Sequence, residues 1–496
     1  MGVGARFARR HLPHLIVTAV ALIALLGPEG AIGTVQSAST IFLNLFNGAT
    51  LAIALGAVVI CAVIACSPLG SRRLGGAGAQ PEFRLLTWFA MLFAAGMGTG
   101  LVFWGAAEPL IHWVTPPPGG AASMSDAARR DSLAITQFHW AIHAWAIYAL
   151  AGLVVGVAMR DAATPPMPSA PFAKLPLGWR RIIDWGAVIA VVFGIVATLG
   201  QGAFQMSAGV GRLSQGAIAD SVLLQAVIMV ILTVAYLSSA VVGLRRGIAV
   251  LSNINLVMAG GLALFVLIAG PTSAILQTAW DSLTAYLVQF WALSTTLRPE
   301  GEARAWTHGW SITYLLWWVA WTPFVGAFIA RISYGRRLRT FVAGVVLIPS
   351  IVTLVWFSIF GGAAIHFQSS GVDFGITDFE NAPKAIFLLL ESLPITAITQ
   401  TLAVALVFIF LLTSADSGAY VLAMITSQKA VPPVAERLFW GGTLAVIAIS
   451  VILSADGQEA TRAFAVSGAI PMIALLTAQT LALVGYFRTS KPKAET

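Results

Sequence analysis

Long apolar segments separated by short polar loops recur along the whole chain. A helix needs about 20 mainly apolar residues to cross the roughly 30 Å hydrocarbon core of a bilayer. Twelve segments meet this requirement, so the pattern predicts twelve transmembrane helices. They are 12–34, 40–66, 85–108, 133–159, 182–209, 221–244, 248–270, 306–332, 339–362, 396–426, 436–455 and 463–487.

Two further apolar segments are predicted to lie along the membrane interface instead of crossing the bilayer. Segment 273–297 contains several polar residues, among them Asp281. Segment 381–394 is shorter than a span requires and carries Lys384 and Glu391. Charged side chains are costly inside the bilayer and far less so at its surface, so both segments fit an interfacial position.

The basic residues are distributed unevenly between the two sides of this arrangement. Loops on the side of the termini hold 21 of the 28 lysine and arginine residues, and the opposite loops hold the remaining 7. Because Lys and Arg accumulate in cytoplasmic loops, we expect both termini in the cytoplasm and the protein in the inner (plasma) membrane. The net charge of +8 follows from this asymmetry and does not indicate a nucleic-acid partner.

The composition agrees with a protein that lies in lipid. Only 10% of the residues are charged and 58% are hydrophobic, whereas a soluble domain carries about 25% charged residues. An ordinary soluble enzyme and a disordered chain are therefore excluded. We find no nucleotide-binding motif and no cysteine–histidine cluster typical of zinc, so no cofactor is expected. Transport by this chain would be driven by an ion gradient.

The third predicted span contains Gly96, Gly98 and Gly100, with Met97 between the first two. Each glycine weakens a helix by about 1 kcal/mol relative to alanine. An interrupted helix exposes amides that attract an anion and carbonyls that coordinate a cation. Close helix packing is the alternative, because Gly96 and Gly100 also have the GxxxG spacing. The other motifs of the chain favour an interrupted helix at a substrate site.

The eighth predicted span contains Trp317, Trp318 and Trp321, followed by Pro323. Trp317 and Trp321 are one helical turn apart and share a face. Pro323 removes a backbone hydrogen bond, so an interruption of the helix is expected near it. Membrane tryptophans usually lie at the interface, but three indoles in the middle of a span are more simply a cage for a cation.

The fourth predicted span carries Trp140, Trp145 and Tyr148 together with His139 and His143. Trp145 and Tyr148 share a helix face, whereas Trp140 lies outside that narrow stripe. The two histidines have the i,i+4 spacing of a metal pair, but no third ligand is evident from the sequence. Hydrogen bonds between helices are therefore their expected role.

The tenth predicted span carries Thr413, Ser414 and Asp416. The two hydroxyl oxygens suit a hard cation such as sodium. Asp416 is the one acidic residue placed well inside a span, where a charge is costly and is a candidate for function. A structural role, as an acceptor of hydrogen bonds near a helix break, is an equally good interpretation.

Spans three to seven and eight to twelve form two sets of five, and five is odd, so the second set is inverted. Each set opens with an interrupted helix, and paired interruptions point to a transport site at the midplane. Thr198 in one set and Thr413 and Ser414 in the other predict two related ion sites. The expected divisions are 1–70 (two leading helices), 71–272 (first five-helix repeat), 273–305 (periplasmic amphipathic segment), 306–487 (second, inverted repeat) and 488–496 (short cytoplasmic tail).

Six motifs, in order between about residues 70 and 430, resemble the betaine/choline/carnitine transporter family. They are PEFRLLTWFAMLFAAGMGTGLVFWGAAEP (81–109), HWAIHAWAIYAL (139–150), FGIVATLGQGAFQ (193–205), GIAVLSNINL (247–256), WWVAWTPFVGAFIARISYGR (317–336) and FLLTSADSGAYVLAMITS (410–427). The resemblance implies an all-α polytopic membrane protein with twelve transmembrane helices. Ten of them would form a LeuT-type inverted repeat of 5+5 helices behind the two leading helices.

The resemblance also implies a substrate site and two sodium sites. The substrate site would comprise Trp317, Trp318, Trp321, Trp140, Trp145, Tyr148 and the backbone of Gly96, Met97, Gly98 and Gly100. The first sodium ion would be bound by Ala94, Met97, Phe410, Thr413 and Ser414, and the second by Thr198 and Phe324. Ile195 departs from the family pattern, because many members carry a hydroxyl residue there.

The predicted function is import of a quaternary-ammonium compatible solute, of the glycine betaine, choline or carnitine type, by sodium-coupled alternating access. The expected partners are a small cationic or zwitterionic substrate, the lipid bilayer and further copies in a homotrimer. An enzyme or a channel is not expected, because neither a catalytic constellation nor a continuous polar pore face is evident. A LeuT-type symporter for a sulfonium compound, ectoine, proline or another amino acid, and a sodium-independent exchanger, remain alternatives.

Overall fold

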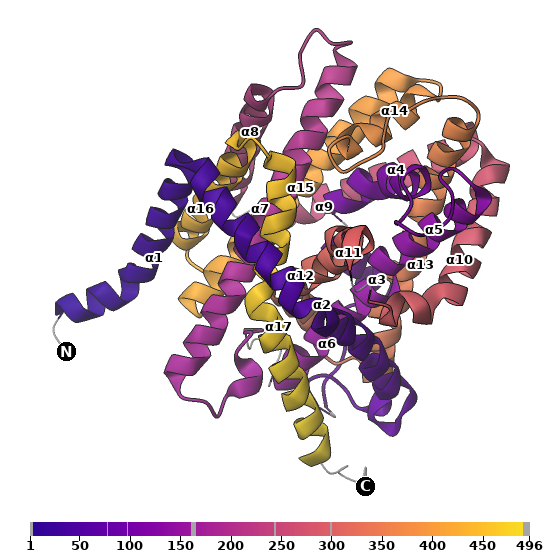
Figure 1. Cartoon of the computed structure of the whole chain (residues 1–496). Coiled ribbons are helices and arrows are strands. Elements are labelled where there is room, and N and C mark those ends of the chain that lie inside the picture. The colour runs from indigo at the N-terminus through magenta and orange to yellow at the C-terminus, as the bar shows by residue number, and fades with distance from the viewer. Residues whose placement is uncertain are drawn as a thin grey trace.

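The structure, a computed structural model, describes residues 3–76, 78–96, 98–159, 165–242, 245–297 and 300–489. The helices formed by these residues cross one another and pack around a central set of helices (Figure 1). The longer helices are α1 (Val3–Leu26), α2 (Pro28–Cys66), α3 (Leu85–Gly96), α4 (Thr99–Val114), α5 (Asp126–Trp140), α6 (Ile142–Ala158), α7 (Leu177–Leu213), α8 (Val222–Val242), α9 (Arg245–Ala269), α10 (Thr272–Thr295), α12 (Thr313–Ile332), α13 (Leu338–Ser369), α15 (Thr396–Ser427), α16 (Val434–Leu453) and α17 (Gly457–Thr489). Two are short, α11 (Gly301–Thr307) and α14 (Ala385–Glu391).

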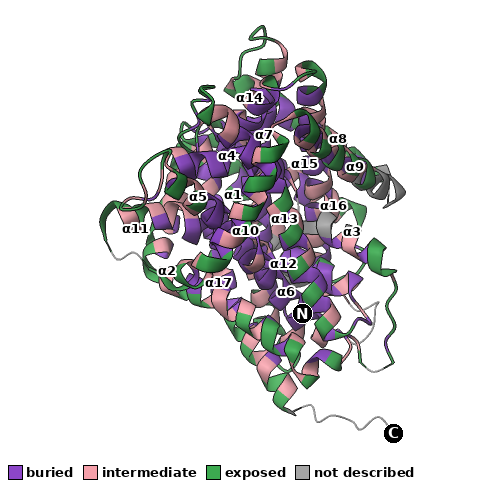
Figure 2. Ribbon diagram, turned by 90° about the vertical axis from the view of Figure 1, so that its right-hand side faces the viewer, coloured by how far each residue is buried: buried purple, intermediate pink, exposed green. Residues whose placement is uncertain are grey.

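Burial separates central helices from peripheral ones. In the most apolar part of Asp126–Ala158, which covers α5 and α6, 83% of the residues are buried, against 28% in Val222–Val241 of α8. Figure 2 shows buried residues gathered in the middle of the molecule and exposed residues along its outside. On the periphery Leu223, Val257 and Val288 are 74–83% exposed. Because lipid tails are as apolar as these side chains, such exposure is expected of helices that face a bilayer.

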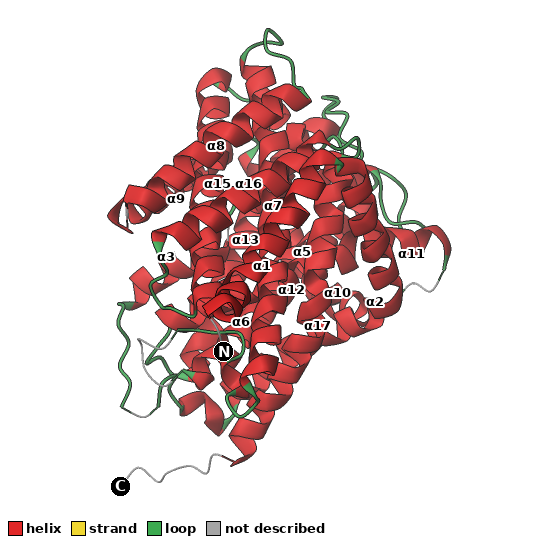
Figure 3. Cartoon of the chain, turned by 90° about the vertical axis from the view of Figure 1, so that its left-hand side faces the viewer, coloured by secondary structure: helices red, strands yellow, loops and turns green. Residues whose placement is uncertain are grey.

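The all-α fold class is confirmed for the part of the chain that the structure describes. Figure 3 shows helices joined by loops and no strand in that part. Nine of its helices are long and apolar enough to cross a membrane, or ten if α9 and α10 count as one bent span. The nine correspond to nine of the twelve predicted spans.

The other three predicted spans differ from simple long helices, so the total of twelve stays a prediction. In the first, His14–Leu26 is the apolar helical part among the residues whose side chains the structure describes. The third is divided between α3 and α4. The seventh corresponds to α9, which makes an angle of 113° with α10.

The predicted boundary between the first two helices is wrong. The sequence placed a loop at 35–39, but α1 ends at Leu26 and α2 runs without a break from Pro28 to Cys66. Proline is well tolerated in the first turn of a helix, because a backbone N–H at that position would have no acceptor within the helix. Gly27 and Pro28 therefore make the boundary, and the polar residues that follow are helical.

The two segments predicted to be interfacial do not form separate straight spans. Segment 273–297 is α10, which follows Pro271 and turns sharply away from α9. Segment 381–394 contains a single turn, Ala382–Lys384, and the seven-residue helix α14. A helix of seven residues is about 10 Å long, so it cannot cross the bilayer.

Candidate functional site

The glycine-rich part of the third predicted span interrupts a helix, as the sequence predicts. Helix α3 ends at Gly96 and α4 begins at Thr99, and Met97 lies outside the described residues. A Cβ atom at Gly98 would lie 3.8 Å from Oγ of Ser414, so the break faces α15. The break between α3 and α4 and the Ser414 hydroxyl of α15 are therefore brought together.

Gly100, one residue into α4, contacts Trp140. A Cβ atom at this position would lie 2.8 Å from Cη2 of the indole, which is closer than real Cβ contacts. The absent side chain allows the Trp140 ring to pack directly on the backbone of α4. The glycines and the aromatic residues of the fourth predicted span therefore belong to one site.

The fourth predicted span contains a break that the sequence did not indicate. Helix α5 ends at Trp140 and α6 begins at Ile142, and Ala141 between them has φ −98° and ψ −123°. In a continuous helix the His139 carbonyl would accept a bond from the amide four residues later. Here it accepts a hydrogen bond from Nε1–H of Trp318 at 2.7 Å. The break thus fixes the position of an indole from α12.

Four aromatic side chains from α5, α6 and α12 form one buried group, which we call the aromatic cluster: Trp140, Trp145, Tyr148 and Trp318. The Trp318 ring centroid lies 5.2 Å from that of Trp140 and 5.4 Å from that of Tyr148, both edge to face. Trp145 meets Tyr148 in the same way at 5.7 Å. All four are at most 8% exposed. Aromatic rings in this arrangement favour one another and also present π-faces to a cation.

The structure does not bring the three indoles of the eighth predicted span together. Trp317 is half-buried, and its ring lies 6.4 Å from Tyr314. Trp321 packs on Phe324 at 5.5 Å and on α7, where a Cβ at Gly194 would lie 2.6 Å from its Nε1. Among these three indoles, only Trp318 joins the aromatic cluster. Trp317, one position away, points to another side of α12, and Trp321, nearly one turn further along the helix, packs on Phe324 and α7 instead.

The expected interruption at Pro323 is also wrong. Helix α12 continues through this proline from Thr313 to Ile332. The missing N–H of Pro323 would leave the carbonyl of Val319 without its helical partner. The hydroxyl of Thr322 donates to that carbonyl at 2.6 Å. A local side-chain hydrogen bond therefore compensates for the proline and keeps the helix intact.

The residues predicted to bind sodium lie beside two contacts between helices. In the first group, Ser414 faces Gly98, and the hydroxyl of Thr413 donates to the carbonyls of Ile409 and Phe410, both at 3.0 Å. A hydroxyl that donates in this way retains lone pairs for a cation. Ala94 lies in α3, on the other side of the same break.

In the second group, Thr198 and Phe324 lie on the two helices that meet at Gly194. The Thr198 hydroxyl donates to the Gly194 carbonyl at 3.1 Å. Trp321 covers Gly194 and contacts Phe324. Ile195, next in the chain, fills the space left by Gly418 on α15.

Asp416 is not the only buried acid on the helices that the structure describes. Asp184 in α7 is 4% exposed and accepts hydrogen bonds from Ser169 and from Gln428. Glu108 in α4 is fully buried. Asp416 itself pairs with Arg437 of α16 at 3.2 Å, and α15 continues through this position without the helix break that the structural interpretation assumed.

Glu108 is the residue of this site that sequence reasoning missed. One carboxylate oxygen, Oε2, accepts Nε1–H of Trp140 at 2.6 Å, and Oε1 accepts Nδ1–H of His139, also at 2.6 Å. Tyr314 stacks on His139 with 4.6 Å between ring centroids. Glu108 therefore orients Trp140 in the aromatic cluster. The available indication was a carboxylate within the run 101–114, whose only other ionisable residue is His112.

His143 has the role that the sequence predicts. Its Nδ1 lies 3.2 Å from the Tyr286 hydroxyl, and its Nε2 lies 2.8 Å from Oγ of Ser294. Both partners belong to α10, so this histidine links α6 to α10 by hydrogen bonds.

A family model described as the betaine/carnitine/choline family transporter matches residues 11–492. The chain belongs to this family. The resemblance found in the sequence motifs is thereby confirmed. Members of the family are transporters, so this multi-pass membrane protein is a transporter and not an enzyme.

Relatives of this family member match most of its length. The glycine betaine transporter of Bacillus subtilis (strain 168) is 38% identical over 489 residues, which are 97% of this chain and 94% of that protein. The glycine betaine/proline/choline transporter of Vibrio parahaemolyticus is 38% identical over 450 residues, with 86% and 80% covered. The ectoine/hydroxyectoine transporter of Virgibacillus pantothenticus is 34% identical over 444 residues, with 88% of each covered.

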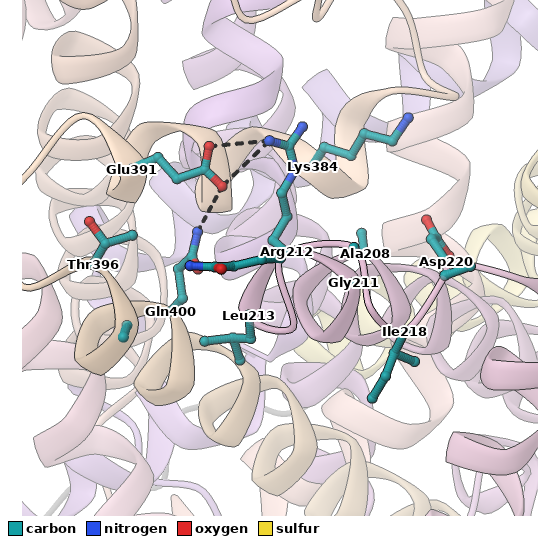
Figure 4. Close-up of a pocket in the computed structure, with 14 residues that line it drawn as sticks. Ala208, Gly211, Arg212, Leu213, Ile218, Asp220, Lys384, Glu391, Thr396 and Gln400 are labelled. Carbon is teal, nitrogen blue, oxygen red and sulfur yellow. Dashed lines mark hydrogen bonds and ion pairs between the residues drawn. The ribbon is translucent and has the colours of Figure 1, made fainter.

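Two cavities lie outside the aromatic cluster of this transporter. One, of about 680 Å³, lies where the end of α7 meets α14 and the start of α15, and there Glu391 accepts hydrogen bonds from Arg212 and Gln400, both at 3.1 Å (Figure 4). The other, of about 700 Å³, lies between α2, α11 and the start of α17 and reaches Thr313. No residue of the aromatic cluster lines either cavity.

We expect Arg437→Ala to destabilise the transporter. The substitution leaves the Asp416 carboxylate, which is 2% exposed, without its ion-pair partner. Removing one member of a fully buried pair costs about 3–5 kcal/mol, and the partial exposure of Arg437 reduces this to roughly 2 kcal/mol. The apparent melting temperature in detergent should fall by several degrees. The double variant Asp416→Asn, Arg437→Gln should melt closer to the parent, and a melting temperature as low as that of Arg437→Ala would contradict this account.

Proposed function

We propose that this chain is a secondary active transporter that imports a quaternary-ammonium compatible solute of the glycine betaine type, coupled to sodium. The observation that supports this most is the aromatic cluster, in which four buried rings from three helices meet. A trimethylammonium group has no N–H that needs a hydrogen-bond acceptor. Aromatic faces attract such a cation by about 0.5–2 kcal/mol each once water is excluded.

The helix break beside the cluster suits the other end of a zwitterion. Amide groups at the start of a helix attract a carboxylate, and α4 begins at Thr99 within the glycine stretch 96–100. Gly100 contacts Trp140, so the break and the cluster are adjacent. Glycine betaine would place its carboxylate at these amides and its ammonium group against the rings.

Sodium coupling is supported by the contact between this break and α15. An ion held by backbone oxygens of Ala94 and Met97, with Phe410, Thr413 and Ser414, would tie the two parts together. Coupling then requires that the tied conformation bind the solute more tightly than the open one. Thr198 and Phe324 would hold a second ion at the contact of α7 with α12.

The finer features of the architecture belong to the same proposal. We place ten of twelve transmembrane helices in a LeuT-type inverted repeat, with both termini in the cytoplasm and the chain in the plasma membrane. The loop asymmetry of the basic residues supports this orientation. Helix α10, with Trp280, Val288 and Trp291 more than 60% exposed, would provide the contact of a homotrimer.

Solute counterflow into proteoliposomes tests the substrate and the coupling together. The panel contains glycine betaine, choline, carnitine, proline, ectoine and dimethylsulfoniopropionate, each assayed in sodium and in potassium. We expect exchange of glycine betaine in sodium only. Because one relative is an ectoine transporter, ectoine is the second candidate, and exchange of ectoine without glycine betaine would favour it. Equal exchange in potassium would contradict the coupling and favour a sodium-independent exchanger.

Gly100→Ala is expected to lower uptake roughly tenfold, since inserting a methyl group into a packed contact costs about 1–3 kcal/mol. The new Cβ would displace the Trp140 ring, which lies 2.8 Å away. The matched control is Gly56→Ala, because this helical glycine has open space around it. Initial uptake rates at equal amounts of reconstituted protein provide the measurement. Equal rates for both variants would argue against the Gly100–Trp140 contact.

A further inference from the structure

We propose that Glu108, His112 and His139 form a binding site for a divalent transition-metal ion of the zinc class. One ligand atom from each residue lies within 4.8 Å of the others, and all three side chains are fully buried. Glu108 and His112 are one turn apart on α4, and His139 comes from α5. The site is separate from the proposed sodium sites and does not depend on the identity of the solute.

His112 is the side chain that most requires a ligand. Neither of its ring nitrogens has a hydrogen-bond partner among the described residues. Its Nε2 lies 3.7 Å from Oε1 of Glu108, which is beyond hydrogen-bond distance. Its ring also contacts the rings of Trp306, Trp310 and His139, at 5.4, 4.5 and 5.8 Å between centroids. A buried imidazole without a polar partner is unfavourable, and a metal ion next to Glu108 would supply one.

The groups that orient metal ligands in known sites are already in place here. A ligating histidine donates its other ring N–H to an acceptor, and a ligating carboxylate is itself hydrogen-bonded. Nε2 of His139 lies 2.9 Å from Oγ of Ser311, and Oε2 of Glu108 accepts Nε1–H of Trp140. Nδ1 of His139 and Oε1 of Glu108 are therefore the atoms left to bind the ion. The Ser311 hydroxyl can accept as well as donate, so it suits the histidine tautomer that ligation requires.

Small movements convert the present arrangement into a coordination sphere. Two ligands of one tetrahedral zinc ion lie roughly 3.3 Å apart, given metal–ligand distances of about 2.0–2.1 Å. Oε1 of Glu108 is now 2.6 Å from Nδ1 of His139 and 3.7 Å from Nε2 of His112. The ion would replace the proton shared by the first pair and draw the second pair together. The fourth position would hold a water molecule.

The ligand set selects the class of ion. Two imidazoles and one carboxylate suit zinc, copper or nickel, whereas sodium, magnesium and calcium prefer oxygen ligands. Because the other oxygen of Glu108 holds Trp140, a bound ion would tie a member of the aromatic cluster to α4 and α5 together. The ion could enter from the cavity between α2, α11 and α17, whose lining residue Arg462 lies over the ring of Trp310.

Zinc binding to the purified full-length protein, freed of its affinity tag and stripped with EDTA, tests the proposal. Equilibrium dialysis with elemental analysis should find about one zinc ion per chain. His112→Gln should weaken binding at least about tenfold, since even supporting residues of metal sites contribute 10–100-fold. This variant loses no hydrogen bond, so its melting temperature should be close to that of the parent. His112→Cys, which restores a ligand, should recover binding.

His143→Gln is the matched control. His143 is equally buried and lies one turn after His139, but its partners are Tyr286 and Ser294. Zinc binding should be unchanged in this variant. Cobalt bound to the parent protein should show the absorption of a tetrahedral site, a readout that does not depend on any variant. Absence of stoichiometric zinc in the parent, or equal zinc affinity in the parent and His112→Gln, would overturn the proposal.

Discussion

Trp318→Ala is expected to reduce solute uptake to the background rate, a loss of at least about 100-fold. The indole supplies the ring between Trp140 and Tyr148, and its N–H satisfies the His139 carbonyl at the break between α5 and α6. A cation–π contact in a dry site contributes about 2 kcal/mol, and an orphaned buried carbonyl costs about 1–3 kcal/mol. Together these exceed the roughly 2.8 kcal/mol that correspond to a factor of 100. Sodium-driven uptake of labelled glycine betaine into proteoliposomes provides the measurement.

Two further substitutions separate the contributions of this side chain. Trp318→Phe retains a ring but loses the N–H donor, so its uptake should lie between those of the parent and the alanine variant. Trp179→Ala removes a tryptophan that is 61% exposed at the start of α7, and it should transport like the parent. Near-normal uptake by Trp318→Ala at equal reconstituted amounts would remove the aromatic cluster from the transport mechanism.

The double substitution Thr413→Ala, Ser414→Ala is expected to raise the sodium concentration for half-maximal uptake at least about tenfold. Each lost oxygen ligand is expected to weaken sodium binding by more than about 0.7 kcal/mol. The two losses together then reach about 1.4 kcal/mol, which corresponds to a tenfold change in sodium affinity. Ser414 faces the glycine break, and the Thr413 hydroxyl donates to the carbonyls of Ile409 and Phe410 one turn earlier on α15. Initial uptake rates at graded sodium and constant ionic strength provide the measurement.

A matched control exists on the same helix. Thr401→Ala removes an exposed hydroxyl that also donates to a carbonyl of its own helix, that of Ala397 at 2.7 Å. Its sodium dependence should equal that of the parent. If the double variant also kept the parent's sodium dependence, the first sodium site would have to lie elsewhere, while the assignment of the solute to the aromatic cluster would stand.

Features set by local composition could be predicted from the sequence. Apolar runs long enough to cross a bilayer are visible without any structure, and nine of the predicted spans match long apolar helices. The break between Gly96 and Thr99 could be predicted because three glycines weaken a helix in the place where they occur.

Features that depend on one compensating contact could not be predicted. Pro323 indicated an interruption, but the Thr322 hydroxyl satisfies the freed carbonyl and α12 continues. Ala141 gave no indication of a break, because alanine favours helix; the break persists where an indole from another helix takes the carbonyl of His139. In both cases a side chain decided the backbone conformation.

The sequence by itself determined the class of protein, most of its spans and its family, because the length of the hydrophobic runs and the order of the motifs are properties of the chain alone. Only the tertiary structure decided which aromatic residues meet, and that Glu108 and His112 lie beside His139. The 3.6-residue period records which residues share a face of one helix, but not which face of another helix lies opposite. Packing decides that pairing, and the aromatic cluster and the candidate metal site both result from it.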